Sequence, residues 1–170
     1  MVRSRAVVVA ILAAVLAGSS AAGWWLGAQR RADDARHSAV VVDVLDGDTV
    51  TVRTDDGATD TVRLLGVDTP ETHHPEQGVQ CFGPEAAAFT TARLRGERIE
   101  LEDDVERRDQ YDRRLSYVLV DGVRFNDELL RLGYARLLVI EPNREHARSM
   151  LRAEFDAKFA RRGLWGACEE

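Results

Sequence analysis

The chain contains almost no lysine and has no excess of positive charge. Lys158 is the single lysine among 23 basic residues. The others are arginines, whose planar guanidinium favours bidentate phosphate binding over diffuse attraction. Beyond residue 36 there are 18 basic and 27 acidic residues, a net charge of −9. A protein that holds nucleic acid mainly by neutralising phosphates needs a basic surface. The charge balance argues against that class, and any phosphate contact must be local or mediated by a metal ion.

Charged side chains are absent from residues 6–29, a run of 24 residues between two basic stretches. Its first part, residues 6–18, is apolar like the core of a signal peptide, and the small residues that end at Ala22 offer a cleavage site. The run is also longer than the ~20 residues that a transmembrane helix needs. Trp24 and Trp25 would suit a membrane interface. Length favours a retained anchor, but a signal peptide cleaved near Ala22 remains the alternative.

The chain therefore divides into an N-terminal hydrophobic targeting helix with a short linker, residues 1–37, and a domain at residues 38–168. We expect the domain to be extracytoplasmic, either secreted after cleavage or held at the membrane by the helix. Cysteine is scarce, and the two that are present, Cys81 and Cys168, fit an oxidising compartment in which they form one disulfide. Two unrelated thiols are the alternative.

From residue 39 the pattern is typical of β-structure. Alternating or β-branched runs between turn residues predict five strands. Their ranges are 40–45, 49–54, 61–67, 98–102 and 115–120. A helix over residues 83–95 separates the third strand from the fourth. This order predicts an α+β fold with a five-stranded OB-type barrel, an inserted helix and C-terminal helices, although the strand count alone fits other α+β sheets.

Two asparagines are expected to begin the C-terminal helices. Asn126 and Asn143 each precede a helical pattern, and asparagine is a common N-cap. In the last helix the apolar residues Met150, Leu151 and Phe155 recur at approximately helical spacing, and Phe159 continues the series.

Acids and arginines concentrate between residues 46 and 71. Asp48, Asp68 and Glu71 supply the hard oxygen ligands that suit Ca²⁺. A carboxylate can also take a proton from water, and a guanidinium such as that of Arg63 can hold a phosphate oxygen. Together these groups predict metal-assisted cleavage of a phosphodiester. Asp46 is expected to be either a turn residue or a residue that supports the site residues from outside, and it is left out of the predicted site.

Four segments of the chain resemble the staphylococcal nuclease (thermonuclease) family. They are residues 46–50 (DGDTV), residues 62–72 (VRLLGVDTPET), residues 83–86 (GPEA), and Tyr111 with Arg113. The resemblance extends over roughly residues 39–166, and the segments follow the order of the family. It implies an OB-fold barrel with Ca²⁺-dependent cleavage of DNA and RNA, usually leaving a 3′-phosphate.

The resemblance also implies individual roles. Arg63, Glu71 and Arg113 match the catalytic residues of the family. Asp48 and Asp68 match its metal-binding carboxylates, and Thr69 matches the residue whose backbone carbonyl joins them. Tyr111 matches a tyrosine that contacts the phosphate of the bound nucleotide.

The nucleotide cleft departs from the family pattern at three places. The loop at residues 73–77 has no lysine, Gln110 stands where a lysine is expected, and residues 137–140 are aliphatic instead of aromatic. Base stacking contributes ~1–3 kcal/mol per base. We therefore expect weaker or less base-selective nucleotide binding, with no catalytic group lost.

The sequence thus predicts an exported Ca²⁺-dependent nuclease that acts on DNA and RNA, with no protein partner evident. One alternative is a non-catalytic OB-fold module that binds nucleic acid or protein. Another is a Ca²⁺-stabilised structural domain, which would need the carboxylates but not the arginines. The presence of Arg63, Glu71 and Arg113 together favours the enzyme.

Overall fold

The structure is a computed structural model that describes residues 36–72 and 78–168. The predicted targeting helix at residues 6–29 and the cleavage site near Ala22 lie outside the described residues. Within the described ranges, no helix is long and apolar enough to cross a membrane.

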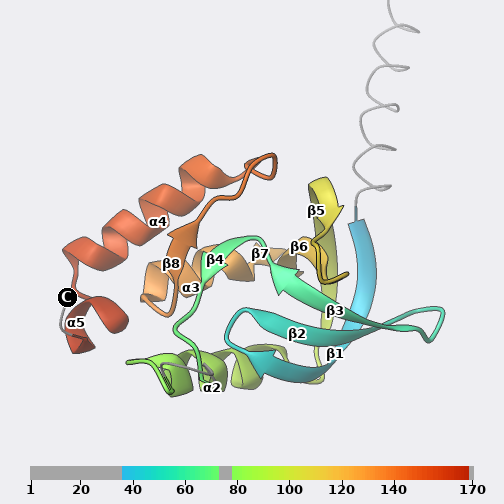
Figure 1. Cartoon of the computed structure of the whole chain (residues 1–170), viewed down its shortest axis with the longest axis horizontal. Helices are drawn as coiled ribbons and strands as arrows, with labels where there is room; N and C mark the ends of the chain where they lie inside the picture. Colours follow the sequence, from blue (N-terminus) through green and yellow to red (C-terminus); the bar gives the residue numbers. More distant parts are fainter. Residues whose placement is uncertain (1–35, 73–77, 169–170) are drawn as a thin grey trace, which may run out of the picture. The chain divides into compact units, whose positions relative to one another are not determined.

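Five strands close into a barrel. They are β1 (Arg36–Asp46), β2 (Thr49–Thr54), β3 (Thr59–Leu64), β5 (Arg98–Arg108) and β6 (Arg114–Val120). Antiparallel pairing joins β2 to β1 and β3, and joins β5 to β1 and β6; a parallel pairing of β3 with β6 completes the ring (Figure 1). A two-residue strand, β7 (Val123–Arg124), pairs with the end of β6. The predicted α+β fold with a five-stranded barrel and additional helices is confirmed, and the parallel pairing makes the barrel a mixed one.

Alternation along the strands builds the core of the barrel. In β2, Val50 and Val52 are fully buried, whereas Arg53 is exposed. Val62 and Leu64 of β3 are buried in the same cluster. Because neighbouring side chains of a strand point to opposite faces, every second residue enters the core. β-Branched residues such as valine pack well on this half-buried surface.

The third strand is shorter than the sequence predicts. It ends at Leu64, and the chain turns before a separate strand, β4 (Gly66–Asp68), pairs with β8 (Arg136–Leu138) outside the barrel. Gly66 has a φ of 73°, a left-handed conformation that glycine adopts without steric cost. A Cβ at Gly66 would also collide with the side chain of Met150. The continuous prediction over 61–67 was wrong because the apolar run belongs to two sheets.

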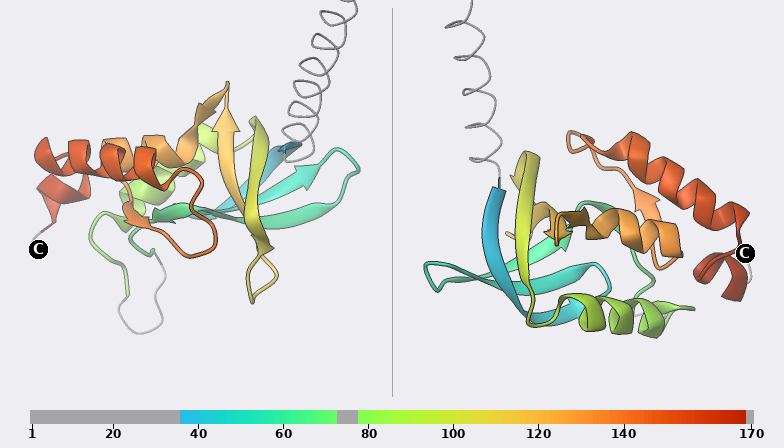
Figure 2. Two further views of the ribbon diagram at one scale, coloured as in Figure 1. Left: turned by 90° about the horizontal axis from the view of Figure 1, so that it is seen from above. Right: turned by 180° about the vertical axis from the view of Figure 1, so that it is seen from behind.

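In the described part of the chain, four helices accompany the barrel. They are α2 (Gly83–Leu94), α3 (Phe125–Leu132), α4 (Ala147–Phe159) and α5 (Leu164–Ala167). α2 packs along β1, and α3 packs on α4. Figure 2 shows α3, α4 and α5 gathered at one end of the domain, with the β2–β3 hairpin projecting from the other end.

Both predicted asparagine caps were wrong. Asn126 lies inside α3, whose N-cap is Arg124, and Asn143 lies before α4, whose N-cap is His146. The two side chains instead bond to distant backbone. Asn126 accepts a hydrogen bond from the Val118 N–H and donates one to the Leu65 carbonyl, each at 2.8 Å. The side-chain amides that were predicted to cap helices therefore make tertiary hydrogen bonds instead.

The apolar repeat predicted for the helix that is now α4 does not form the buried face of that helix. Met150 is 1% exposed, but Leu151 is 56% exposed, Phe155 64% and Phe159 85%. The helix instead buries Met150, Ala153, Glu154 and Ala157.

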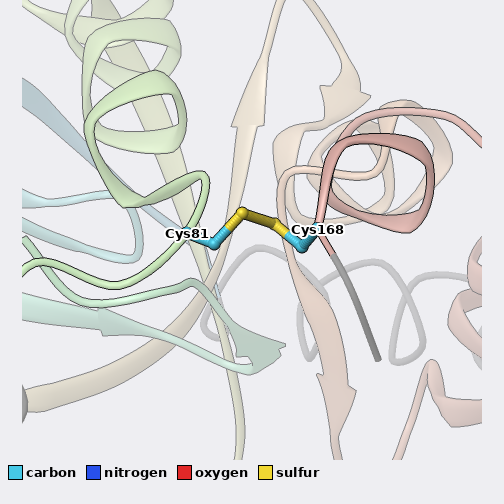
Figure 3. The surroundings of a disulfide bond; sticks show 2 residues. All are labelled: Cys81 and Cys168. Atoms are coloured by element: carbon cyan, nitrogen blue, oxygen red, sulfur yellow. A yellow bond between two sulfur atoms is a disulfide. The ribbon is translucent and has the colours of Figure 1, made fainter.

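Cys81 and Cys168 form the expected disulfide, with their Cα atoms 6.0 Å apart. The bond joins the segment before α2 to the residue after α5 (Figure 3). Beside it, Ala157, Leu164 and Trp165 form a small apolar cluster against which Phe82 packs. The C-terminal helices are thus tied to the loop that leads from β4 to α2.

Candidate active site

The turn between β1 and β2 places Asp48 in a fixed position. Its side chain is 7% exposed. Asp48 Oδ2 accepts the Thr69 N–H at 2.9 Å, and Oδ1 accepts the Thr49 hydroxyl at 3.0 Å. From α2, the Thr90 hydroxyl donates to the Gly47 carbonyl at 2.6 Å. The turn is therefore held from both sides, and Asp48 is oriented by contacts far apart in the sequence.

Arg63, on β3, joins Asp48 to Asp68. Its Nη2 lies 3.1 Å from Asp48 Oδ2 and 3.2 Å from Asp68 Oδ1. Its Nη1 donates to the carbonyls of Leu64 and Val67 at 2.8 and 2.7 Å. These four contacts hold the guanidinium at the point where β3 ends and β4 begins, and they bring two carboxylates from separate elements to one nitrogen.

Asp68 is the accessible member of this pair, since half of its side chain (51%) is exposed. Burial of the remainder raises the pKa of its carboxyl, and the negative charge of Asp48 adds to the effect. Arg63 and Arg136 oppose this, but the pKa stays above its ordinary value. Placing a cation between Asp48 and Asp68 would relieve the repulsion between them.

The backbone of Glu71 is held by the segment before α2. Its N–H donates to Gln80 Oε1 at 2.9 Å, and its carbonyl accepts the Gln80 N–H at 2.9 Å. Gly83 packs directly against this point, because a Cβ there would lie 2.7 Å from the Glu71 carbonyl oxygen. Gln80 also precedes the disulfide-bonded Cys81. The loop that begins at Glu71 is thus closed at its base by Gln80 and Gly83.

The side chain of Glu71 lies among acids. A hydrogen bond with Asp46 is the largest cause that raises the pKa of Glu71 to about 7; burial comes next, followed by the charges of Asp46, Asp48 and Asp68. Asp46 accepts the Gly47 N–H at 2.8 Å, and its carboxylate is also bonded to Thr72. The sequence left Asp46 open as a turn residue or as a support for the site residues and kept it out of the site; the contact with Glu71 agrees with the second of these.

Arg113 lies in the connection between β5 and β6. Its N–H and its Nε donate to the two oxygens of the Asp109 carboxylate, at 2.9 and 2.7 Å. The guanidinium carbon lies 5.4 Å from the centroid of the Tyr111 ring, within the range of a cation–π contact. Asp109 therefore orients Arg113, and Tyr111, which is 71% exposed, lies under it.

One cavity of about 430 Å³ brings the two arginines together. Arg63 and Arg113 are 50 residues apart in the sequence, and both line it with Tyr111. Leu138 and Ile140 contribute an apolar wall, at the place where the family pattern leads us to expect aromatic residues. Asp48 and Asp68 do not line the cavity but contact the guanidinium of Arg63.

The donor atoms near Arg63 fit a hard cation. Asp48 and Asp68 supply carboxylate oxygens, and Thr69, which follows Asp68, has a buried hydroxyl with no hydrogen-bond partner among the residues that the structure describes. Within the described ranges, no three His, Cys, Asp or Glu side chains form a ready-made metal centre. Two carboxylates, a carbonyl and water suit Ca²⁺, which accepts six to eight oxygens in flexible geometry.

The fold and site define a small β-barrel protein in which two arginines line a cavity of nucleotide size and one of them, Arg63, contacts a pair of carboxylates. Residues 61–167 match the family model described as staphylococcal nuclease homologue. The chain is 37% identical over 125 residues to a thermonuclease of Staphylococcus hyicus, covering 74% of this chain and 73% of that protein. It is 37% identical over 138 residues to a thermonuclease of Staphylococcus intermedius, covering 81% and 82%.

A further relative is the endonuclease YncB of Bacillus subtilis (strain 168), 40% identical over 123 residues, with 71% of this chain and 58% of that protein covered. The chain belongs to the staphylococcal nuclease family.

Proposed function

We propose that this protein is an exported, Ca²⁺-dependent nuclease that hydrolyses phosphodiester bonds in DNA and RNA and leaves 3′-phosphates. Membership of the family makes the chain a nuclease by homology, since the relatives above are named thermonuclease or endonuclease. The finer statements on metal, product and location are proposals. Residues 38–168 form the OB-fold catalytic domain of the proposed enzyme.

One observation supports the proposal most directly: the guanidinium of Arg63 contacts both Asp48 and Asp68 while lining the cavity that Arg113 also lines. A scissile phosphate at this end of the cavity would lie within reach of two arginines. Guanidinium groups bind phosphate oxygens bidentately. Fixed donors aimed at charge that develops in the transition state are usually the largest catalytic contribution.

Asp48, Asp68 and the backbone carbonyl of Thr69 are proposed to hold the Ca²⁺ ion. When bound, the ion would supply positive charge next to the phosphate. Asp48 is fixed by the Thr69 N–H, so two of the proposed ligands are already connected. Asp68 is half exposed, which leaves room for water and substrate.

Glu71 is proposed to accept a proton from the attacking water. Its pKa of about 7 lies near neutral pH, where a general base is most effective. As the water oxygen bonds to phosphorus, the bond from phosphorus to the 5′-oxygen breaks. The leaving oxygen takes a proton from solvent water and becomes a 5′-hydroxyl, and the phosphate stays on the 3′ side. Arg63 and Arg113 hold the non-bridging oxygens, and Tyr111 positions the next phosphate.

Export is proposed from two features. The disulfide between Cys81 and Cys168 is typical of oxidising compartments, and residues 6–29 are uncharged. N-terminal sequencing of the native protein distinguishes a cleaved signal peptide from a retained membrane anchor. A start near Gly23 indicates a secreted enzyme, and an intact Met1 or Val2 indicates an anchor.

Cleavage of 5′-labelled single-stranded DNA and RNA, with Ca²⁺ or with EGTA, tests the function. We expect fragments only with Ca²⁺, and phosphatase treatment should change their mobility because each carries a 3′-phosphate. Absence of Ca²⁺-dependent fragments would overturn the proposal of a Ca²⁺-dependent nuclease and would favour a non-catalytic binding module.

Variants separate the proposed roles. Glu71→Gln should lose ~10²–10⁴-fold in kcat, and Arg113→Ala on the order of 10²–10³-fold, the loss seen when one transition-state donor is removed. Arg98→Ala is the matched control, since Arg98 is an exposed arginine paired with Asp55 at 2.8 Å and does not line the cavity. Full activity of Glu71→Gln would refute its role.

A further inference from the structure

The outer face of α4 carries an exposed apolar stripe made of Leu151, Phe155 and Phe159. These residues are 56%, 64% and 85% exposed. They are spaced by four positions, so they follow one line along the helix. Figures 1 and 2 show α4 along the outer edge of the domain, with α3 and β8 on its inner side. Contiguous apolar surface of this kind marks an interaction site more often than a solvated face.

Arginines bound the stripe at both ends. Arg148 is three positions before Leu151 within α4, so the two side chains lie on the same side of the helix, and Arg162 follows shortly after the helix ends at Phe159. Arg148 is exposed, whereas Arg162 also donates to the Arg131 carbonyl at 3.1 Å.

The charge of this segment is opposite to that of the domain. Residues 147–162 contain five basic and two acidic residues, a net charge of +3, whereas residues beyond 36 together carry −9. Of the two acids, Glu154 is buried and paired with Lys158 at 3.1 Å. Local positive charge around exposed phenylalanines complements an anionic surface with an apolar interior.

A second copy of the chain fits this face less well. A fully covered phenylalanine buries ~150–250 Å², so the stripe offers on the order of 400 Å². A stable interface buries about 800 Å² per partner. Two copies meeting at this face would also oppose two sets of arginines.

We propose that the outer face of α4 docks on an anionic lipid surface, with Leu151, Phe155 and Phe159 inserted below the headgroups. Arg148 and Arg152, both exposed residues of the same helix, would lie beside lipid phosphates. Amphipathic helices with basic flanks and aromatic residues lie in the membrane interface in this way. Stable membrane attachment commonly needs two contacts. The uncharged residues 6–29 of the same chain supply an independent reason for the domain to be near a bilayer.

Lipid-quenching fluorescence on the full chain tests the proposal. Leu151→Cys is labelled with a thiol-reactive dye, which is specific because both native cysteines are in the disulfide. The vesicles contain phosphatidylglycerol, phosphatidylcholine and a nitroxide-labelled lipid. The matched control is Ala58→Cys, an exposed position in the β2–β3 hairpin at the other end of the domain (Figure 2). The readout reports which face meets lipid, whatever attaches the chain to the vesicle.

We expect quenching at residue 151 to exceed that at residue 58 at least threefold, and to fall in vesicles of phosphatidylcholine alone. Adding Phe155→Ser and Phe159→Ser should reduce it to the level at residue 58; both side chains are exposed, so folding should be retained. Equal quenching at the two positions, or quenching unchanged by the serine pair, would overturn the proposal. Disulfide-crosslinked dimers through unlabelled Leu151→Cys in preference to lipid quenching would assign the face to a second copy.

Discussion

Replacement of Asn126 by alanine tests how the helices support the site. The Asn126 side chain is fully buried and bonds to the Val118 N–H and the Leu65 carbonyl, both at 2.8 Å. In Asn126→Ala both backbone groups stay buried without a partner. Each such group costs ~1–3 kcal/mol, so the free energy of unfolding should fall by ~2–6 kcal/mol. For a domain of about 130 residues, the unfolding entropy predicts a melting temperature lower by roughly 7–22 °C.

Thermal and urea unfolding followed by circular dichroism measure this loss. Asn143→Ala is the matched control, because Asn143 makes the same two bonds, to the Glu106 N–H at 2.7 Å and the Glu106 carbonyl at 2.8 Å. Glu106 is exposed, so water can replace these bonds, and the loss should stay below about 1.5 kcal/mol. If Asn126→Ala were no less stable than Asn143→Ala, the argument from buried unsatisfied groups would be refuted.

The same variant should also affect catalysis. Leu65 lies between the strand that carries Arg63 and the strand that carries Asp68. Without the bond to the Leu65 carbonyl, this connection is held less firmly. We expect a lower kcat for Asn126→Ala even at temperatures where circular dichroism shows it folded. Unchanged kcat under those conditions would show that the Arg63 contacts alone hold the connection.

Three further changes give measurable outcomes. Replacing Cys81 and Cys168 together by serine opens a crosslink between residues 87 apart in the sequence, and the chain-entropy model predicts a loss of ~4–5 kcal/mol in urea unfolding; a loss below 1 kcal/mol would contradict it. Gly83→Ala would place a Cβ 2.7 Å from the Glu71 carbonyl oxygen. The free energy of unfolding should therefore fall by ~1–3 kcal/mol, and nuclease activity should fall with it. Wild-type activity in this variant would show that α2 can shift freely. The pKa of Glu71 is raised from 4.5 to about 7 in the folded state, so its stabilising contribution is complete below pH 4.5 and is lost as the pH rises through 7. With chelator present, the wild type should therefore lose stability relative to Glu71→Gln across that range. Parallel profiles of stability against pH for the two proteins would exclude the shift.

The strands of the barrel could be predicted because their signals are local. Alternation in β2, with Val50 and Val52 buried, follows from the period of a strand alone. Turn residues such as Asp46-Gly47 mark the ends of strands for the same reason. The break at Leu65 could not be found this way, because residues 64–67 form one apolar run without a polar interruption. Only the partner strand β8 shows where the second sheet begins.

The residues around α3 and α4 show the limit of local rules. Asn126 fits an N-cap by its type, yet the fold uses its amide to bridge Val118 and Leu65. Leu151, Phe155 and Phe159 fit an apolar helix face, yet the helix packs through Met150, Ala153 and Ala157. Which face of a helix is buried depends on the neighbour it meets, and the neighbour is set by topology.

By itself, the sequence determined the family, the barrel strands and the chemical character of the site. The motif at residues 62–72 and the acids around Asp48 are each short continuous stretches of sequence, so they can be recognised without knowledge of the fold. Only the tertiary structure decided that Arg63 contacts Asp48 and Asp68 together, that Arg113 lines the same cavity, and that Asp46 raises the pKa of Glu71. These depend on distances between strands and loops that close a barrel, and such distances arise from pairing and packing of segments far apart in the chain.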